Sequence, residues 1–190
     1  SINVRACFDN EEVGSTTKQG AASTFLADIL RRMNHALGKS EEDYHRALGS
    51  SFMISADNAH ALHPNHPEKS DRNHRVYMNE GIVVKSNAAQ KYTSDAISIA
   101  LFRSLCEQAN VKIQYFANRS DMMGGSTLGN IAQTQVSLHC VDIGLPQLAM
   151  HSCYETAGIY DIEAMIKVIT AFFDTHFHQV DSVNIEMKRR

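Results

Sequence analysis

Apolar and polar positions along the chain follow two different spacings. Apolar residues three and four positions apart are typical of one face of a helix, and they recur over residues 17–37, 41–48, 94–108 and 161–177. Short apolar runs bounded by glycine, proline or polar clusters are typical of strands, and they cover residues 2–8, 51–56, 81–85, 111–117 and 135–142. The pattern therefore predicts a chain in which strands and helices alternate.

Residues at the ends of these segments predict where elements start and stop. Gly38 is a stop signal for the first helix, and Ser94 and Asp161 are the expected N-caps of the third and fourth helices. Residues 62–80 are polar and proline-containing, and residues 120–129 are rich in glycine. Both segments are expected to be loops.

Strands that alternate with helices predict a layered α/β/α domain around a mostly parallel central sheet. A length of 190 residues suits one such domain. The first strand-like run already begins at residue 2, so we expect the sheet to be incomplete at its N-terminus. Ligands of open α/β sheets bind beyond the carboxyl ends of the strands, which is where chemistry is expected.

Composition excludes several classes of function. The net charge of -3 gives no electrostatic footprint for nucleic acid. No apolar run approaches the roughly 20 residues that span a bilayer, so no membrane segment is expected. The four cysteines show no CxxC spacing, and free, buried thiols are favoured over a disulfide or zinc framework. Free thiols are typical of a reducing compartment, which predicts a cytoplasmic protein.

Carboxylates and a histidine follow three of the predicted strands. Glu11 and Glu12 come after the first strand, Asp57 directly after the second, and His151 beyond the fifth. Adjacent residues in an extended backbone point to opposite sides, so one glutamate could bind a metal while the other accepts a proton from water. Solvated charges, a turn-forming aspartate and a core histidine are the ordinary alternatives. The residues alone leave both interpretations open.

Three further features lie near these strand ends. Lys85 closes the third predicted strand and could direct a cation into the same crevice, although an exposed lysine is equally typical there. His60 belongs to a polar, histidine-rich segment. Gly124 and Gly125 would let the backbone approach a ligand closely. Their loop matches neither common phosphate-binding glycine motif, so a packing or peptide-binding loop is favoured.

Five segments, in order along the chain, resemble the motifs of the M18 family aspartyl aminopeptidases. They are FDNEEVGS at residues 8–15, SADNAHALHPN at 55–65, GIVVK at 81–85, QKY at 90–92, and the stretch at 144–156 that contains GLP, HS and ET. Their order and spacing fit the family from residue 1 to about residue 177. Several motifs in order over nearly the whole chain make the resemblance specific.

The resemblance implies a hydrolase that removes N-terminal Asp or Glu from peptides and holds two Zn²⁺ ions per active site to activate water. It implies that Glu11 is the general base, that Glu12 and His151 bind one zinc ion, and that Asp57 binds the other. It also implies that His60, Lys85 and Tyr92 lie in the substrate pocket and that Gly124 and Gly125 help to line it.

Enzymes of this family take one further histidine, a bridging aspartate and a dimerisation domain from sequence upstream of the Glu-Glu motif. The resemblance therefore implies that residues 1–190 are the C-terminal portion of the catalytic domain, with three of five ligands, and that this chain alone is inactive. It also implies a homo-oligomer, a dodecamer, or a complex with the missing N-terminal segment. A metallo-aminopeptidase of broader specificity and an inactive structural fragment remain as alternatives.

Overall fold

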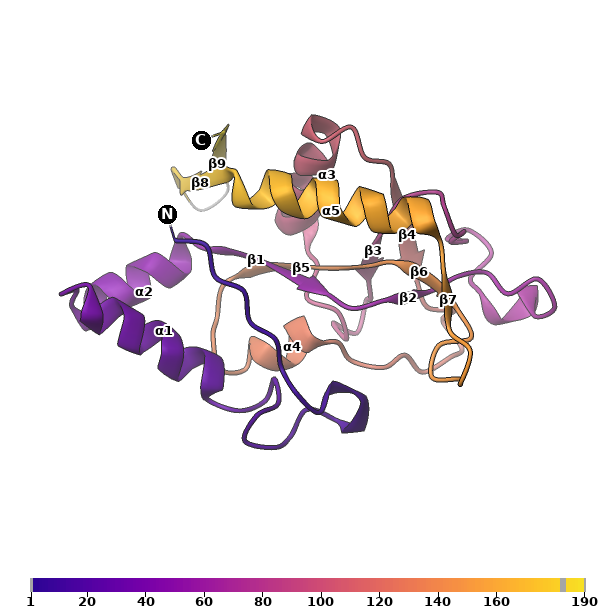
Figure 1. The fold of residues 1–190 in the computed structure, drawn as a ribbon, viewed down its shortest axis with the longest axis horizontal. Coiled ribbons are helices and arrows are strands. Elements are labelled where there is room, and N and C mark those ends of the chain that lie inside the picture. Colours follow the sequence, from indigo (N-terminus) through magenta and orange to yellow (C-terminus); the bar gives the residue numbers. More distant parts are fainter. Residues whose placement is uncertain (1, 182–183, 190) are drawn as a thin grey trace.

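A four-stranded sheet forms the centre of the computed structural model, which describes residues 2–181 and 184–189. Its strands lie in the order β1-β5-β3-β4 (Figure 1). They are β1 (Phe52–Ala56), β3 (Ile82–Ser86), β4 (Ile113–Ala117) and β5 (His139–Gly144). β1 runs parallel to β5 and β3 runs parallel to β4, whereas β3 and β5 are antiparallel. The prediction of a mostly parallel central sheet is confirmed.

Helices cover both faces of this sheet, as the layered prediction required (Figure 1). They are α1 (Phe25–Ala36), α2 (Glu41–Gly49), α3 (Ala96–Gln108), α4 (Leu128–Ala132) and α5 (Ile159–Phe173). On the face covered by α3 and α5, Phe102 and Val168 pack against Ile82 and Val84 of β3. Val83 points to the opposite face, as strand geometry requires, and belongs to a separate small cluster.

Short elements surround the central sheet. β2 (Ala59–His60), β6 (Pro146–Leu148) and β7 (Thr156–Ala157) form a three-stranded sheet, and β8 (Thr175–Gln179) pairs with β9 (Ile185–Arg189). Two 3₁₀ turns, η1 (Glu11–Val13) and η2 (Pro67–Lys69), complete the described elements. Strands of two or three residues carry no readable alternation, which is why the sequence pattern did not predict β2, β6 and β7.

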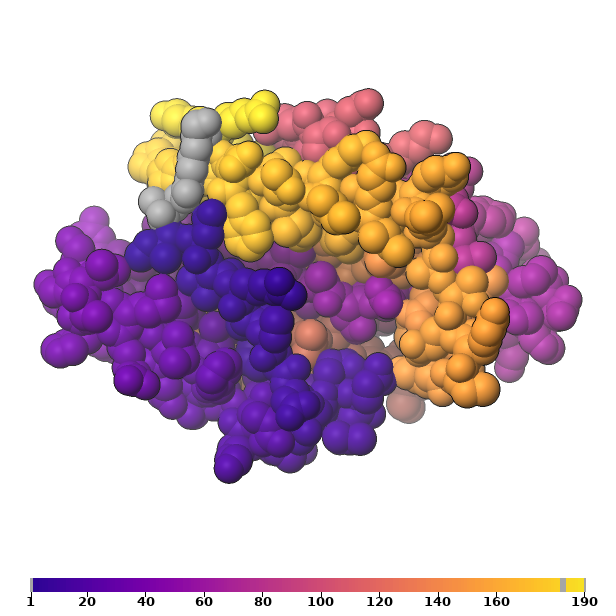
Figure 2. Space-filling model, viewed as in Figure 1, coloured from indigo at the N-terminus to yellow at the C-terminus, as the bar shows by residue number. Residues whose placement is uncertain are grey.

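The first predicted strand, residues 2–8, is wrong for this structure. The segment pairs with no strand among the described residues, and Ile2 and Val4 are 59% and 39% exposed. It crosses the molecule beside α5, where the Asn3 amide donates to the Phe173 carbonyl at 3.0 Å (Figure 2). An alternating sequence becomes a strand only where a neighbouring edge accepts its backbone hydrogen bonds.

Helix α1 begins at Phe25 and not at residue 17. The residues before it fold back in turns, because Ala22 donates its N–H to the Ser15 carbonyl at 3.0 Å. A side chain at Gly20 would place its Cβ 2.2 Å from that same carbonyl. This tertiary contact overrides the helical spacing of residues 17–24. Gly38 stands just after the helix at φ 68°, as its stop signal predicted.

Both predicted N-caps are wrong, and the two residues have other partners. Asp95 caps α3 in a reciprocal box with Ser98, whereas the Ser94 hydroxyl accepts the Asp142 N–H at 2.9 Å. Helix α5 starts after Gly158, so Asp161 lies within its first turn, fully buried. There the carboxylate accepts the N–H groups of Asn79 at 2.5 Å and Gly81 at 2.9 Å.

The other element boundaries differ by smaller amounts. Helix α5 ends at Phe173, so that residues 175–177 belong to β8, and the fifth strand begins at His139. All four cysteines are free, but Cys7 and Cys153 are exposed, so their predicted burial is wrong. Among the described residues, no helix combines the length and apolar character of a membrane span.

Candidate active site

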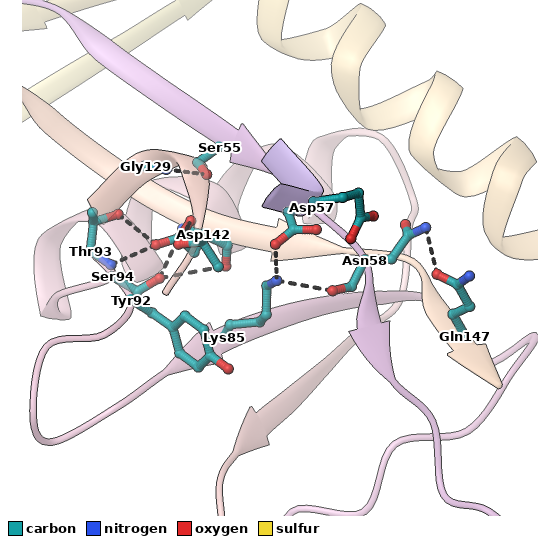
Figure 3. Close-up of polar contacts among 12 residues, drawn as sticks. Ser55, Asp57, Asn58, Lys85, Tyr92, Thr93, Ser94, Gly129, Asp142 and Gln147 are labelled. Carbon is teal, nitrogen blue, oxygen red and sulfur yellow. Dashed lines mark hydrogen bonds and ion pairs between the residues drawn. The ribbon is translucent and has the colours of Figure 1, made fainter. Parts of the chain in front are cut away.

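Strand β3 is antiparallel to its neighbour β5, so the carboxyl ends of the central strands do not all lie at the same edge of the sheet. Asp57 follows β1, and its N–H donates to the Ile143 carbonyl of β5 at 3.0 Å. β3 runs opposite to β5, with Val84 paired to Ile143, so the carboxyl end of β3 points away from that of β1. Lys85 and Asp57 therefore do not follow adjacent parallel strands. Lys85 contacts Asp57 because its long side chain extends to it (Figure 3).

Lys85 is a buried cation whose ammonium group faces the site. Its side chain is 3% exposed, and Nζ lies 3.3 Å from Asp57 Oδ2 and 3.0 Å from the Asn58 carbonyl oxygen. Nζ also lies 5.4 Å from the centroid of the Tyr92 ring. Burial lowers the pKa of Lys85, and the carboxylates of Asp57 and Asp142 act against that effect. A buried ammonium requires such compensation.

Glu12 and His151 meet at the surface. Glu12 Oε2 lies 2.9 Å from His151 Nε2, and their side chains are 70% and 64% exposed. The His151 backbone has φ 66°, a left-handed conformation that is costly for a residue other than glycine. Its N–H donates to Glu155 Oε1 at 2.7 Å, which helps to hold this turn. The two side chains that the resemblance implied as ligands of one zinc ion thus lie beside each other.

Glu11 precedes Glu12 in the 3₁₀ turn η1, so the expected extended backbone at this pair is wrong. Burial and the negative charges of Asp57 and Glu12 raise the pKa of Glu11, whereas Lys85 and His151 act to lower it. Glu11 therefore lies within electrostatic range of four other predicted site residues. A raised pKa makes this carboxylate a stronger proton acceptor once it is ionised.

The charges of other predicted site residues also act on His60. It lies in β2, opposite Gln147 of β6. Partial desolvation of the ring lowers the pKa of His60, the charges of His151 and Lys85 add to this, and Asp57 opposes it. A lowered pKa favours the neutral form of the ring.

Tyr92 lies next to Lys85, and its hydrogen-bond partner Asn118 lies beside the glycine loop. Tyr92 is 8% exposed, and its hydroxyl donates to Asn118 Oδ1 at 3.2 Å. Burial, followed by the charges of Asp142 and Asp57, raises the pKa of Tyr92 to about 12. A side chain at Gly124 would place its Cβ 2.3 Å from Asn118 Nδ2, whereas a Cβ at Gly125 would meet nothing within 4 Å. A Cβ at Gly124 would therefore require the Asn118 amide to shift, whereas Gly125 borders open space.

Asp142 was not among the predicted site residues. It is fully buried in β5, and its carboxylate accepts hydrogen bonds from Thr93 and Thr127 (Figure 3). The sequence signal that could have indicated Asp142 is a charged residue inside the otherwise apolar strand sequence HCVDIG. Asn58, whose Nδ2 donates to Gln147 Oε1 at 2.8 Å, was also missed, because this contact joins residues 89 positions apart.

The Glu12–His151 pair fits two positions of a zinc site. Glu12 Oε2 and His151 Nε2, which lie 2.9 Å apart, are a carboxylate oxygen and an imidazole nitrogen, and both are donor types that zinc binds. Asp57 is engaged by Lys85 and does not join this pair. Across residues 2–181 and 184–189, no three His, Cys, Asp or Glu side chains come close enough to hold a metal ion. The donor types of Glu12 and His151 fit zinc.

Comparisons with known proteins agree with this chemistry. The family described as Aminopeptidase I zinc metalloprotease (M18) matches residues 1–173. A probable M18 family aminopeptidase 2 from Clostridium acetobutylicum is 53% identical over 174 residues, which are 92% of this chain and 40% of that protein. A counterpart from Stutzerimonas stutzeri is 45% identical over 172 residues, 90% of this chain and 39% of that protein. The chain spans about 40% of the length of these relatives.

Solved structures show the same fold. A chain in the cryo-EM structure of the Ape4 and Nbr1 complex matches with a TM-score of 0.85 and 39% identity, over 87% of this chain and 31% of that one. The mApe1 dodecamer of S. cerevisiae matches with a TM-score of 0.76 and 31% identity, over 87% of this chain and 36% of that one. The chain belongs to the M18 family of zinc metallo-aminopeptidases.

Proposed function

We propose that the protein carrying this chain is a zinc-dependent aminopeptidase that removes N-terminal Asp and Glu from peptides, with two zinc ions per active site. The observation that carries the acidic specificity is the buried ammonium group of Lys85. Its carboxylate partner, Asp57, is also a proposed zinc ligand, and a carboxylate that shares its charge with a metal ion compensates the lysine charge less well. When Asp57 binds metal, the acidic side chain of a substrate takes its place beside Lys85.

Zinc, when bound, supplies the Lewis acidity that polarises a peptide carbonyl and lowers the pKa of water. Glu12 and His151 would hold one ion and Asp57 the other. Glu11 acts as general base: it accepts a proton from the attacking water and passes it to the leaving amine. His60, Tyr92 and the loop at Gly124 and Gly125 form the walls of the pocket around Lys85.

Residues 1–190 would be the C-terminal portion of the catalytic domain. The incomplete ligand set and the 40% coverage of the relatives support this assignment. So do the apolar residues of α5 that face solvent, Ile159 at 73% and Ile166 at 63% exposure, because such faces are typical of surfaces that another polypeptide covers. The remaining ligands and a dimerisation domain would come from the N-terminal portion, in a homo-oligomer such as a dodecamer. The free cysteines fit a cytoplasmic location.

A panel of Asp, Glu, Leu and Lys amides, hydrolysed by the intact protein, tests this function. We expect the acidic amides to be preferred and a chelator to abolish turnover. Lys85→Met should lower kcat/KM for the acidic amides by about 10- to 100-fold, the effect of losing a hydrogen bond to a charged group. The Leu amide should change less than about 3-fold, since it makes no such bond.

Lys112→Met is the matched control, because Lys112 is 82% exposed and lies 3.7 Å from Glu80, away from the site. It should leave the whole panel unchanged. An equal loss of Asp and Leu hydrolysis in Lys85→Met would refute the pocket assignment. A wild-type protein without preference for acidic amides would favour a metallo-aminopeptidase of broader specificity.

A further inference from the structure

A buried carboxylate below the proposed pocket joins two chain segments that form its wall. Asp142 Oδ2 accepts the N–H of Thr93 at 2.6 Å and its hydroxyl at 2.9 Å, and Oδ1 accepts the Thr127 hydroxyl at 2.8 Å. Thr93 directly follows Tyr92, and Thr127 lies in the glycine loop, two residues after Gly125. Both oxygens of one carboxylate are thus used to fix two segments that are far apart in the sequence (Figure 3).

Asn118, which directly follows β4, lies between the same two segments. The Tyr92 hydroxyl donates to Asn118, and the Asn118 amide occupies the space that a side chain at Gly124 would need. Asp142, Tyr92, Asn118 and the glycine loop therefore form a closed ring of contacts. The ring lies beside Lys85, whose Nζ is 5.4 Å from the Tyr92 ring centroid.

The sheet anchors this ring. Asp142 is paired with Ser55 in the β1–β5 register, and the Ser55 hydroxyl accepts the Gly129 N–H at 2.9 Å. The Asp142 N–H donates to Ser94. Strand β5 thus supports the wall from the rigid centre of the molecule, which is the arrangement that keeps pocket side chains in place.

We propose that Asp142 is a positioning residue of the acidic-substrate pocket, which holds Tyr92 and the glycine loop in place next to Lys85 through Thr93 and Thr127. The proposal rests on the proposed function, because the pocket matters only if Lys85 binds an acidic side chain. Asp142 does not touch substrate. Its effect should therefore appear in the binding of acidic substrates more than in the rate of the chemical step.

Kinetics of the intact protein on an Asp amide and a Leu amide test the proposal. Asp142→Asn keeps the size but replaces charge-assisted hydrogen bonds by weaker neutral ones, and KM for the Asp amide should rise about 5-fold. Thr127→Val removes the hydroxyl at a buried site, and KM for the Asp amide should rise about 10-fold. In both variants kcat and the KM for the Leu amide should stay within about 2-fold of wild type.

Two controls separate positioning from general stability. Thr127→Ser keeps the hydroxyl and should restore the wild-type ratio of the two KM values. Asp161→Asn alters another fully buried carboxylate that accepts two backbone N–H groups, outside the pocket wall. It should lower the Tm without changing the KM ratio.

Equal increases of KM on both amides would overturn the inference, and so would a Thr127→Ser variant as impaired as Thr127→Val. If Asp142→Asn does not fold, the comparison of Thr127→Val with Thr127→Ser tests the proposal by itself. A wild-type protein that prefers acidic amides, combined with variants of unchanged KM ratio, would overturn the inference and leave the proposed function intact. A wild-type protein without that preference would overturn both.

Discussion

Asp57 and Lys85 form an ion pair in which the proposed chemistry gives Asp57 a second cation to bind. The pair is held at 3.3 Å, with the lysine almost fully enclosed. A buried cation left without a partner is costly, so Lys85 selects whatever anion replaces Asp57. At the scale of single residues, this exchange of partners links metal binding by Asp57 to recognition of an acidic side chain.

Glu11 and Glu12 are adjacent but should respond differently to the same substitution. Glu11→Gln should retain the zinc content of the wild type and lose about 10²–10⁴-fold in kcat, because an amide cannot accept the proton from water. Glu12→Gln should lose zinc as well as rate, because it removes a carboxylate ligand. Elemental analysis of the purified intact proteins, together with kcat on an Asp amide, distinguishes the two roles.

Glu163→Gln serves as the control for this pair, since Glu163 contacts Lys167 on the surface of α5 at 2.7 Å. It should match the wild type in zinc content and rate. Zinc loss in Glu11→Gln, or normal zinc in Glu12→Gln, would show that the roles are assigned to the wrong residues.

Individual site residues differed in how far the sequence could predict them. The pairing of Glu12 with His151 followed from family motifs, and the structure brings the two side chains together. The contact of Lys85 with Asp57 arises from an antiparallel strand, which no local pattern reveals. Asp142 was overlooked because its partners, Thr93 and Thr127, lie in loops whose path depends on the whole fold.

At the scale of elements, strand β5 sets the position of the site. Gly144, its last residue, lies so close to the chain after β1 that a Cβ there would come within 2.1 Å of the Asp57 carbonyl oxygen. This close approach holds the turn that presents Asp57 and Asn58. The glycine is required by packing against backbone, which cannot move aside as a flexible side chain can.

Gly144→Ala should therefore displace the Asp57 turn. We expect a loss of about 1–3 kcal/mol in the free energy of unfolding, the usual cost of overpacking, together with a marked fall in kcat/KM. Gly49→Ala is the matched control, because a Cβ at this helical position meets nothing within 4 Å. It should be neutral or stabilise the protein by up to about 1 kcal/mol. Urea unfolding and kinetics of the intact protein measure both effects, and equal behaviour of the two variants would contradict the packing argument.

Sequence patterns predicted elements well where local signals and packing agreed. The predictions for α2, β1, β3 and β4 were close to the observed bounds, because apolar residues of the three strands face the main core and Leu48 of α2 packs against a second, smaller cluster. They failed at residues 2–8 and 17–24. In the first case no described strand edge accepts the backbone, and in the second a contact between Ser15 and Ala22 replaces helical hydrogen bonds.

At the scale of the whole molecule, the sheet and the helical layers are present, Lys85 contacts Asp57, and Glu12 lies beside His151. Relatives of this chain are about two and a half times its matched length, as the 40% coverage implies. We propose that the remaining ligands lie in that additional polypeptide. The mApe1 relative assembles as a dodecamer, and an assembly of that kind would place further chains near each site.

The most direct test is the turnover of an Asp amide by residues 1–190 alone, measured beside the intact protein with zinc in excess. Circular dichroism should first establish that the isolated chain is folded. We predict that the folded chain has no measurable peptidase activity, because Glu12, His151 and Asp57 do not complete the metal site. Near-native turnover by this chain would contradict the account, since it would show that these residues suffice for catalysis.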